Sequence, residues 1–315
     1  MIYPISYSFP KELMVPIVPF KTQYDVKSAY GFNDVEPYMA EYRKSIFGGT
    51  CLKCGWDCLR HYEILSQGTI TNFGTNYRGS GLKDIPARTM TTFPKEQIAL
   101  LMNKYGNSDF ETIMRTSSSD LYNDLDELLQ YTRTKLTTEA NANYLYETTK
   151  TVSPDKLLFI TNQSSSGDYL LDMTAHGFKL TTNGLCDIFP DYDYRYKSYP
   201  LEESKNLYGK GFNYTRLLDD SLRNRSSESE IAQKIKERFY EKIFVYISHD
   251  SRKIEMPFPE LYNYYEPDEI SLICGNDCDP MYYEEEKFWY INMWHECHLR
   301  PYADKFDIFI RELGN

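Results

Sequence analysis

The chain has 315 residues, of which 41% are hydrophobic and 16% aromatic, so it can bury a substantial core and is not a disordered segment. Its formal net charge of −11 excludes a protein that grips DNA or RNA along the phosphate backbone. No stretch approaches the ~20 apolar residues that span a bilayer, and we expect no signal peptide. The seven cysteines are unevenly spaced, so we expect a reduced, cytoplasmic protein.

The first half of the chain alternates helical patterns with short strands. Prolines 4, 10, 16 and 19 predict extended chain at the start. The apolar, glycine-bounded segment 44–48 is typical of a buried strand, and Pro94 opens a helix in the first-turn position that proline tolerates. Helices are expected over 35–42 and from 94 to 105, and two more between 119 and 147 with a break near 137.

A linker-like segment at 149–155 precedes a second series of strands and helices. The apolar run 156–161, a serine-rich loop and a helix over 168–180 form the strand–loop–helix opening of a Rossmann-like domain. We therefore predict an α/β fold with two domains, 1–150 and 151–315, whose C-terminal strand returns toward the first domain. Further strands are expected over 185–189, 242–248, 269–275 and 306–311, and further helices over 231–239 and up to 266.

The segment 55–73 combines a glycine turn, a short helix, a second glycine and a strand. Asp57 is the expected helix N-cap, and Arg60 and Glu63 are three residues apart on one helix face. A helix N-terminus attracts anions, a guanidinium pairs with a diphosphate, and a carboxylate accepts hydrogen bonds from sugar hydroxyls. The segment is therefore a candidate nucleotide-sugar site, and a surface ion pair between Arg60 and Glu63 is the alternative.

The run Arg60-His-Tyr-Glu63-Ile-Leu-Ser-Gln-Gly68-Thr-Ile70 resembles the donor-site signature of exostosin-like glycosyltransferases, in which an Arg-x-x-Glu helix leads into a strand. The segments 55–58 and 93–95 are similar to a branch of that family found in bacteria and large DNA viruses. Thr71 stands where the family usually has a proline. The second half is similar to the family's partner domain at 167–170, 207–215, 246–249 and 273–277.

The resemblance implies two Rossmann-like domains that face a cleft, the GT-B architecture. The donor signature comes first here, which implies a circularly permuted domain order, with a displaced gene boundary as the alternative. The implied function is transfer of a sugar from a UDP- or GDP-sugar to a glycan or other hydroxyl acceptor, inverting and without a metal or other cofactor. A non-catalytic glycan- or partner-binding protein on a degenerate version of the fold is the alternative. The implied donor-binding residues are Gly55, Trp56, Asp57, Arg60, Glu63 and Lys95.

An inverting transfer needs a base for the proton of the acceptor hydroxyl, and we expect it in the second domain. Asp168 and His249 follow expected strands, at the carboxyl edge where α/β proteins bind ligands, so they are the candidate catalytic residues. Helix capping is the alternative role for Asp168, and a hydrogen-bonded loop histidine is the alternative for His249. The acceptor-side candidates are Tyr208, Lys210, Asp250 and Asp277.

Two further motifs raise the question of a metal. Asp191-Tyr192-Asp193 follows an expected strand, as the Mg²⁺- or Mn²⁺-binding Asp-x-Asp motif of other glycosyltransferases does, but a solvated loop explains it more simply. Cys51 and Cys54, with Cys58 nearby, have the spacing of half a zinc site, but a second tidy pair is missing. We therefore predict no resident metal.

Overall fold

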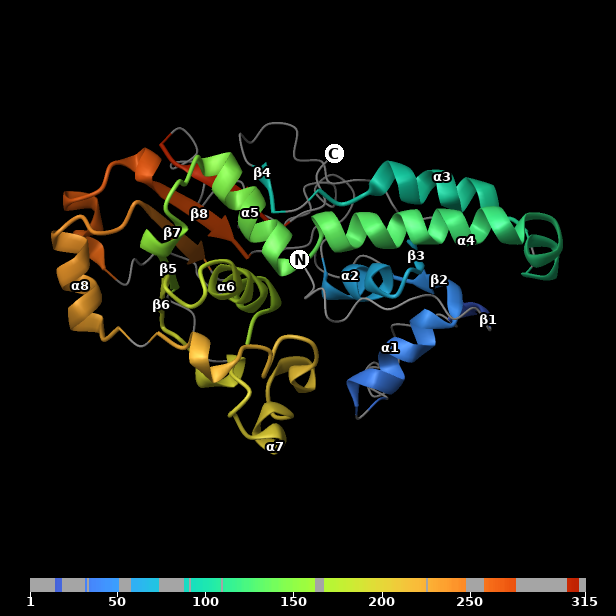
Figure 1. The fold of residues 1–315 in the computed structure, drawn as a ribbon, viewed down its shortest axis with the longest axis horizontal. Helices are drawn as coiled ribbons and strands as arrows, with labels where there is room; N and C mark the ends of the chain where they lie inside the picture. Colours follow the sequence, from blue (N-terminus) through green and yellow to red (C-terminus); the bar gives the residue numbers. More distant parts are fainter. Residues whose placement is uncertain are drawn as a thin grey trace, which may run out of the picture. The chain divides into compact units, whose positions relative to one another are not determined.

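A computed structural model describes Phe32 and residues 15–18, 34–50, 58–73, 88–90, 92–108, 110–161, 167–224, 226–247, 258–275 and 305–311. These residues form α/β structure with parallel sheets, as the sequence predicts, and they divide into two compact units (Figure 1). The first unit holds strands β1 to β3 and helices α1 to α4. The second unit holds strands β4 to β9 and helices α5 to α8.

The first unit contains a three-stranded parallel sheet in the order β1-β2-β3. In the parallel pair β2 and β3, Phe47 lies opposite Ile70, and α2 connects the two strands, so the three elements form one β-α-β unit. Helix α2 ends before Gly68, whose φ of 63° is the left-handed conformation that glycine adopts freely. The bounds are β1 (Val15–Val18), α1 (Val35–Arg43), β2 (Ser45–Gly49), α2 (Leu59–Ser66), β3 (Ile70–Asn72), α3 (Lys95–Tyr105) and α4 (Phe110–Lys135).

The second unit contains a six-stranded parallel sheet in the order β4-β9-β8-β7-β5-β6. The chain leaves β5 for β6 on one side and then returns to place β7 on the other, so the winding direction reverses between β5 and β7. This is the strand order of a doubly wound, Rossmann-like sheet. The bounds are β4 (Arg88–Thr89), α5 (Thr138–Thr149), β5 (Leu157–Thr161), α6 (Tyr169–Thr181), β6 (Asp187–Phe189), α7 (Leu201–Ser204), α8 (Glu228–Lys236), β7 (Lys242–Ile247), β8 (Ile270–Cys274) and β9 (Asp307–Ile310).

Helices cover both faces of the six-stranded sheet. Ile231 and Ile235 of α8 pack on one face, while α5 and α6 pack on the other through residues such as Leu145 and Phe178 (Figure 1). All residues of β5, β7 and β8 are therefore buried. This explains why the sequence of these strands is a continuous apolar run rather than an alternating one.

The predicted strands and helices are confirmed in most places. The break expected near 137 falls between α4 and α5. The two-residue strand β4 was not predicted, and the helix expected to end at 266 is a 3₁₀ turn over Pro259–Asn263. Helix α5 packs against α6 and belongs to the second unit, so the long continuous part of that unit begins at Thr138, ahead of the linker expected at 149–155. None of the helices in the described part is both long and apolar enough to cross a membrane.

Candidate functional site

The first turn of α2 lies at the carboxyl edge of the three-stranded sheet. Thr50, directly after β2, donates its backbone N–H to the carbonyl of Asn72 at the end of β3, at 2.9 Å. The Thr50 hydroxyl lies 3.0 Å from Nδ1 of the buried His61, which belongs to the first turn of α2. The strand ends and the helix N-terminus therefore meet, which is the arrangement that binds phosphate groups in β-α-β units.

The helix begins one residue later than predicted. Its N-cap is Cys58, so the expectation that Asp57 caps the helix is wrong. Cys58 has extended backbone and makes no capping hydrogen bond; its Sγ lies 3.4 Å from Nδ1 of His61. The cap therefore leaves the N–H groups of the first turn to other partners. Asp57 and the other two predicted donor-binding residues of this turn, Gly55 and Trp56, lie outside the described residues.

Arg60 is the second residue of α2 and is half-buried. Burial acts to lower the pKa of its guanidinium, but the neighbouring phenols, the Cys58 thiol and the Glu63 carboxylate outweigh burial and raise it above the ordinary value. The group is therefore cationic at every accessible pH. Within the described part of the chain, this guanidinium forms no hydrogen bond or ion pair. It is a partly desolvated cation next to a helix N-terminus, a combination that favours an anionic ligand.

Glu63 is buried, with 6% of its surface exposed, and its Oε2 accepts a hydrogen bond of 2.5 Å from the Tyr38 hydroxyl. Burial and the Glu63 charge raise the pKa of Tyr38 well above its ordinary value, so the phenol stays protonated and donates. The Tyr42 hydroxyl is 3.3 Å from that of Tyr38. Glu63 thus anchors two tyrosines of α1. Arg60 and Glu63 do not form the surface ion pair that was the alternative to a binding role.

Lys95, the last of the six predicted donor-binding residues, is the first residue of α3. Phe93, two residues earlier, packs against His61 and Tyr62 of α2, with ring centroids 6.0 and 5.7 Å apart. The start of α3 is therefore held against α2. Burial lowers the pKa of Lys95, while the adjacent Glu96 acts to raise it.

Asp168 lies in the second unit, at the N-cap of α6. Its Oδ1 accepts hydrogen bonds from the backbone N–H groups of Leu170 at 3.0 Å and Leu171 at 3.4 Å. The capping role is confirmed, and Asp168 also lies in the β5–α6 connection at the point where the winding of the sheet reverses. The other candidate base, His249, lies outside the described residues, as do Asp250 and Asp277.

The segment around Tyr208 and Lys210 packs beside Asp168. The Tyr208 ring lies edge-on to that of Tyr169, the first residue of α6, with centroids 5.7 Å apart. Tyr214 contacts the same ring at 5.1 Å and donates a hydrogen bond to the Tyr208 carbonyl at 2.7 Å. Tyr208 is 58% exposed, and Lys210 has a left-handed backbone with φ of 58°. The structure thus brings two predicted acceptor-side residues to the neighbourhood of the predicted base.

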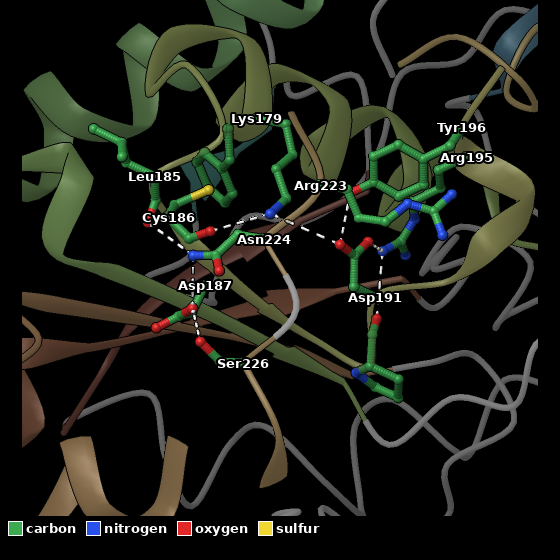
Figure 2. Close-up of polar contacts among 12 residues, drawn as sticks. Lys179, Leu185, Cys186, Asp187, Asp191, Arg195, Tyr196, Arg223, Asn224 and Ser226 are labelled. Atoms are coloured by element: carbon green, nitrogen blue, oxygen red, sulfur yellow. Dashed lines mark hydrogen bonds and ion pairs between the residues drawn. The ribbon is translucent and has the colours of Figure 1, made fainter. Parts of the chain in front are cut away.

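The Asp-Tyr-Asp motif does not have the character of a metal site, because basic side chains already neutralise both carboxylates. Arg195 and the fully buried Lys179 lie 3.7 and 3.8 Å from the carboxylate oxygens of Asp191, and Tyr196 donates to Asp191 at 2.6 Å (Figure 2). Arg223 donates to Asp193 at 2.5 Å. No three His, Cys, Asp or Glu side chains of the described ranges gather as metal ligands.

Arg195 also pairs with a second buried carboxylate, that of Asp172. Its Nε donates to Asp172 Oδ1 at 2.8 Å, and the Tyr194 hydroxyl donates to the same oxygen at 3.0 Å. Asp172 in turn accepts from the backbone N–H of Asp168 at 3.1 Å. This internal ion-pair network fixes the start of α6. The cations could not be assigned to these carboxylates from the sequence, because they lie on separate elements.

The sequence did not single out Tyr38, or Tyr246 near the end of β7, although both place hydroxyls beside predicted site residues. Tyr246 is an ordinary β-strand residue in an apolar run, and Tyr38 is one of 29 tyrosines.

No family model, curated protein or solved structure matches the chain.

Proposed function

We propose that the protein is a glycosyltransferase that moves a sugar from a nucleotide sugar to a hydroxyl acceptor. The observation that carries this proposal is the Arg60 guanidinium, which is half-buried, charged and in no hydrogen bond or ion pair with the residues that the structure describes. It lies in the first helical turn at the carboxyl edge of a parallel sheet, where a diphosphate is stabilised by the helix N-terminus and by charge-assisted hydrogen bonds. The resemblance of residues 60–70 to the exostosin-like donor signature supports the same assignment.

In this reaction the acceptor oxygen bonds to the anomeric carbon while the bond from that carbon to the diphosphate oxygen breaks. The electron pair leaves with the nucleoside diphosphate, and the hydroxyl proton passes to a base. Negative charge grows on the diphosphate in the transition state, so Arg60 and the helix N-terminus stabilise that state more than the ground state. Lys95, at the start of α3, is the second cation that we assign to the diphosphate.

We assign the base to Asp168, the described candidate, with His249 as the other. The inverting, metal-independent course and the permuted GT-B architecture belong to this proposal and are supported by the sequence resemblance. The doubly wound sheet of the second unit is compatible with the Rossmann-like partner domain that such an enzyme needs.

The test is thermal-shift and hydrolysis measurement with a panel of UDP-, GDP- and CMP-sugars. We expect one nucleotide class to raise the melting temperature of the wild-type protein and to be hydrolysed slowly. Arg60→Ala should weaken binding by about 10- to 100-fold, the value of a charge-assisted hydrogen bond. Arg60→Lys should restore only part of it, because a lysine lacks the bidentate fork.

Arg115→Ala is the matched control, since Arg115 is an exposed arginine of α4 in the same unit. It should bind the nucleotide sugar as the wild type does. If Arg60→Ala binds as well as Arg115→Ala, the donor site is elsewhere. If a glycan stabilises the protein but no nucleotide sugar binds or turns over, the chain is the non-catalytic binding protein of the alternative.

A further inference from the structure

Tyrosine rings form a continuous cluster at the carboxyl edge of the six-stranded sheet. Each ring contacts at least one other, with centroids between 5.1 and 6.5 Å apart, and the members are Tyr169, Tyr192, Tyr194, Tyr199, Tyr208 and Tyr214. Tyr169 begins α6 after β5, and Tyr192 and Tyr194 follow β6. The tyrosine cluster therefore lies at the edge where doubly wound sheets bind their ligands.

The inner rings of the cluster are buried and hydrogen-bonded. Tyr194 and Tyr214 are 4% and 2% exposed. The Tyr194 hydroxyl donates to Asp172 Oδ1 at 3.0 Å, and the Tyr214 hydroxyl donates to the Tyr208 carbonyl at 2.7 Å. The backbone N–H of Arg216 donates to the Tyr194 carbonyl at 2.8 Å, which ties the segment that carries Tyr208 to the exit of β6. The inner rings thus form a rigid support for the outer ones.

The outermost ring, that of Tyr208, is 58% exposed and is followed by a left-handed turn. Gly209, Lys210 and Gly211 have φ of 59°, 58° and 68°, a conformation that a lysine adopts only at a cost. A Cβ added at Gly211 would lie 2.6 Å from the Ser204 carbonyl oxygen, so the turn is closely packed against the preceding helix. A costly backbone conformation that fixes an exposed aromatic ring indicates a functional role for that ring.

The surroundings of the Tyr208 ring favour a saccharide as its ligand. The face of an aromatic ring carries negative charge, and the C–H hydrogens on the face of a pyranose carry partial positive charge, so the two stack. The exposed neighbours along the chain, Lys205 and Asn206, are polar and can bond to sugar hydroxyls. A protein partner would be favoured instead by a contiguous apolar surface. A nucleobase also stacks on tyrosine and is the competing ligand.

We propose that Tyr208 is the stacking platform of a saccharide site in the second unit, and that its ligand is a hexopyranose whose C–H face lies on the phenol ring. Tyr169 and Tyr214 hold the platform from the protein side. The identification of this saccharide as the acceptor of the transfer rests on the proposed function, whereas the saccharide site itself does not.

The test uses the full chain without a nucleotide sugar and follows binding by saturation-transfer NMR. The probes are methyl glycosides and disaccharides of gluco, galacto and manno configuration, with sorbitol as a ligand that has hydroxyls but no ring, and uridine monophosphate as the competing ligand. We expect a saccharide to bind and sorbitol not to bind. Tyr208→Ala should weaken saccharide binding by about 10-fold, the value of an aromatic stacking contact. Tyr208→Phe should bind as the wild type does, because it keeps the ring face.

Tyr262→Ala is the matched control, because Tyr262 is a 44% exposed tyrosine of the same unit outside the tyrosine cluster. It should leave saccharide affinity unchanged, and thermal melting checks that both alanine variants are folded. The proposal is overturned if no saccharide binds the wild type, if Tyr208→Ala binds as tightly as Tyr262→Ala, or if sorbitol or uridine monophosphate binds as well as the best saccharide. Failure of nucleotide-sugar binding with saccharide binding retained would contradict the glycosyltransferase alone.

Discussion

Gly48 of β2 lies so close to Ile64 of α2 that a Cβ added at Gly48 would be 2.8 Å from Ile64 Cγ2 and 2.9 Å from Cγ1. Both residues are buried in a close-packed interior, which leaves little room for either to shift. The glycine thus sets the distance between helix and sheet. Arg60 stands one turn earlier on α2, so the same contact sets its position.

We predict that Gly48→Ala costs about 1–3 kcal/mol of unfolding free energy, because overpacking shifts α2 away from the sheet. Nucleotide-sugar binding should weaken with it. Chemical denaturation of Gly48→Ala, Ile64→Ala and the double variant separates packing from other causes. The double variant should be more stable than Ile64→Ala alone, because the new methyl group fills part of the cavity. If the changes in unfolding free energy of the two single variants simply add in the double variant, Gly48 and Ile64 are not energetically coupled.

Two buried threonines beside α2 differ in whether their hydroxyls are satisfied. Thr69 Oγ1 donates to the Tyr42 carbonyl at 2.6 Å, whereas Thr71 Oγ1 has no hydrogen-bond partner among the described residues, and both residues are 0% exposed. Replacing Thr71 by valine should therefore raise the unfolding free energy by about 1 kcal/mol, since it removes an unpaired polar group at nearly constant volume.

Thr69→Val is the control for that change and should lower the unfolding free energy by about 1–3 kcal/mol, because it removes the buried hydroxyl that donates to the Tyr42 carbonyl. Urea denaturation of both variants measures the contrast. Thr71 stands where the exostosin-like signature has a proline, so a stabilised and still nucleotide-binding Thr71→Val would show that this departure is harmless. Equal destabilisation by both substitutions would mean that the Thr71 hydroxyl is bonded in solution.

Strands with both faces covered were the easiest elements to predict. The runs around β5, β7 and β8 are apolar because helices cover both sides of the sheet, so hydrophobicity alone marks them. The order of the strands was not predictable, since pairing depends on long-range packing. The strand β4 has only two residues, and its partner β9 lies more than 200 positions away, so no local pattern could reveal it.

The candidate sites were predictable only where the signal is local. Asp168 was identified because it follows an expected strand at the carboxyl edge of the sheet, and the capping rule for an aspartate before an apolar helix gave its alternative role, which the structure contains. The same rule placed the α2 cap at Asp57, whereas the structure has Cys58 as the cap, and Thr50 and Cys58 both contact His61 in the first turn of the helix. The bond between Tyr38 and Glu63 joins residues 25 positions apart, and no sequence period indicates it.

The ion pair between Asp172 and Arg195 is fully buried, and the Asp193 pair with Arg223 is partly exposed. We predict that Asp172→Asn lowers the unfolding free energy by about 3–5 kcal/mol, because it leaves Arg195 without its closest counter-charge. Asp193→Asn should cost less than about 1 kcal/mol. Calorimetry of the two variants tests this contrast. A large loss in Asp193→Asn, accompanied by loss of a bound divalent cation, would restore the metal interpretation of the Asp-Tyr-Asp motif.

His176 of α6 is buried and neutral, with Nδ1 2.9 Å from the Thr138 hydroxyl. Burial lowers its pKa from 6.5 to about 4. In the unfolded chain the imidazole takes up a proton below about pH 6.5, whereas in the folded protein it does so only below about pH 4. Between these values the unfolded state binds more protons, so the free energy of unfolding falls as the pH is lowered through this window and is unaffected by His176 above it.

The full difference corresponds to about 3 kcal/mol lost by pH 4, and the side chain is too well covered for solvent to screen it. Unfolding free energies should be measured from pH 7.5 to 4.5 for the wild type and for His176→Asn, which keeps a polar atom near Thr138. Subtracting the two curves cancels the carboxylates that titrate in the same range. The difference should be flat above pH 6.5 and should fall in favour of the variant below it. If the difference between the two unfolding free energies stays flat down to pH 4.5, the folded protein protonates His176 as readily as the unfolded chain does. The packing of α5 against α6 would then have to open to accommodate the charged imidazole.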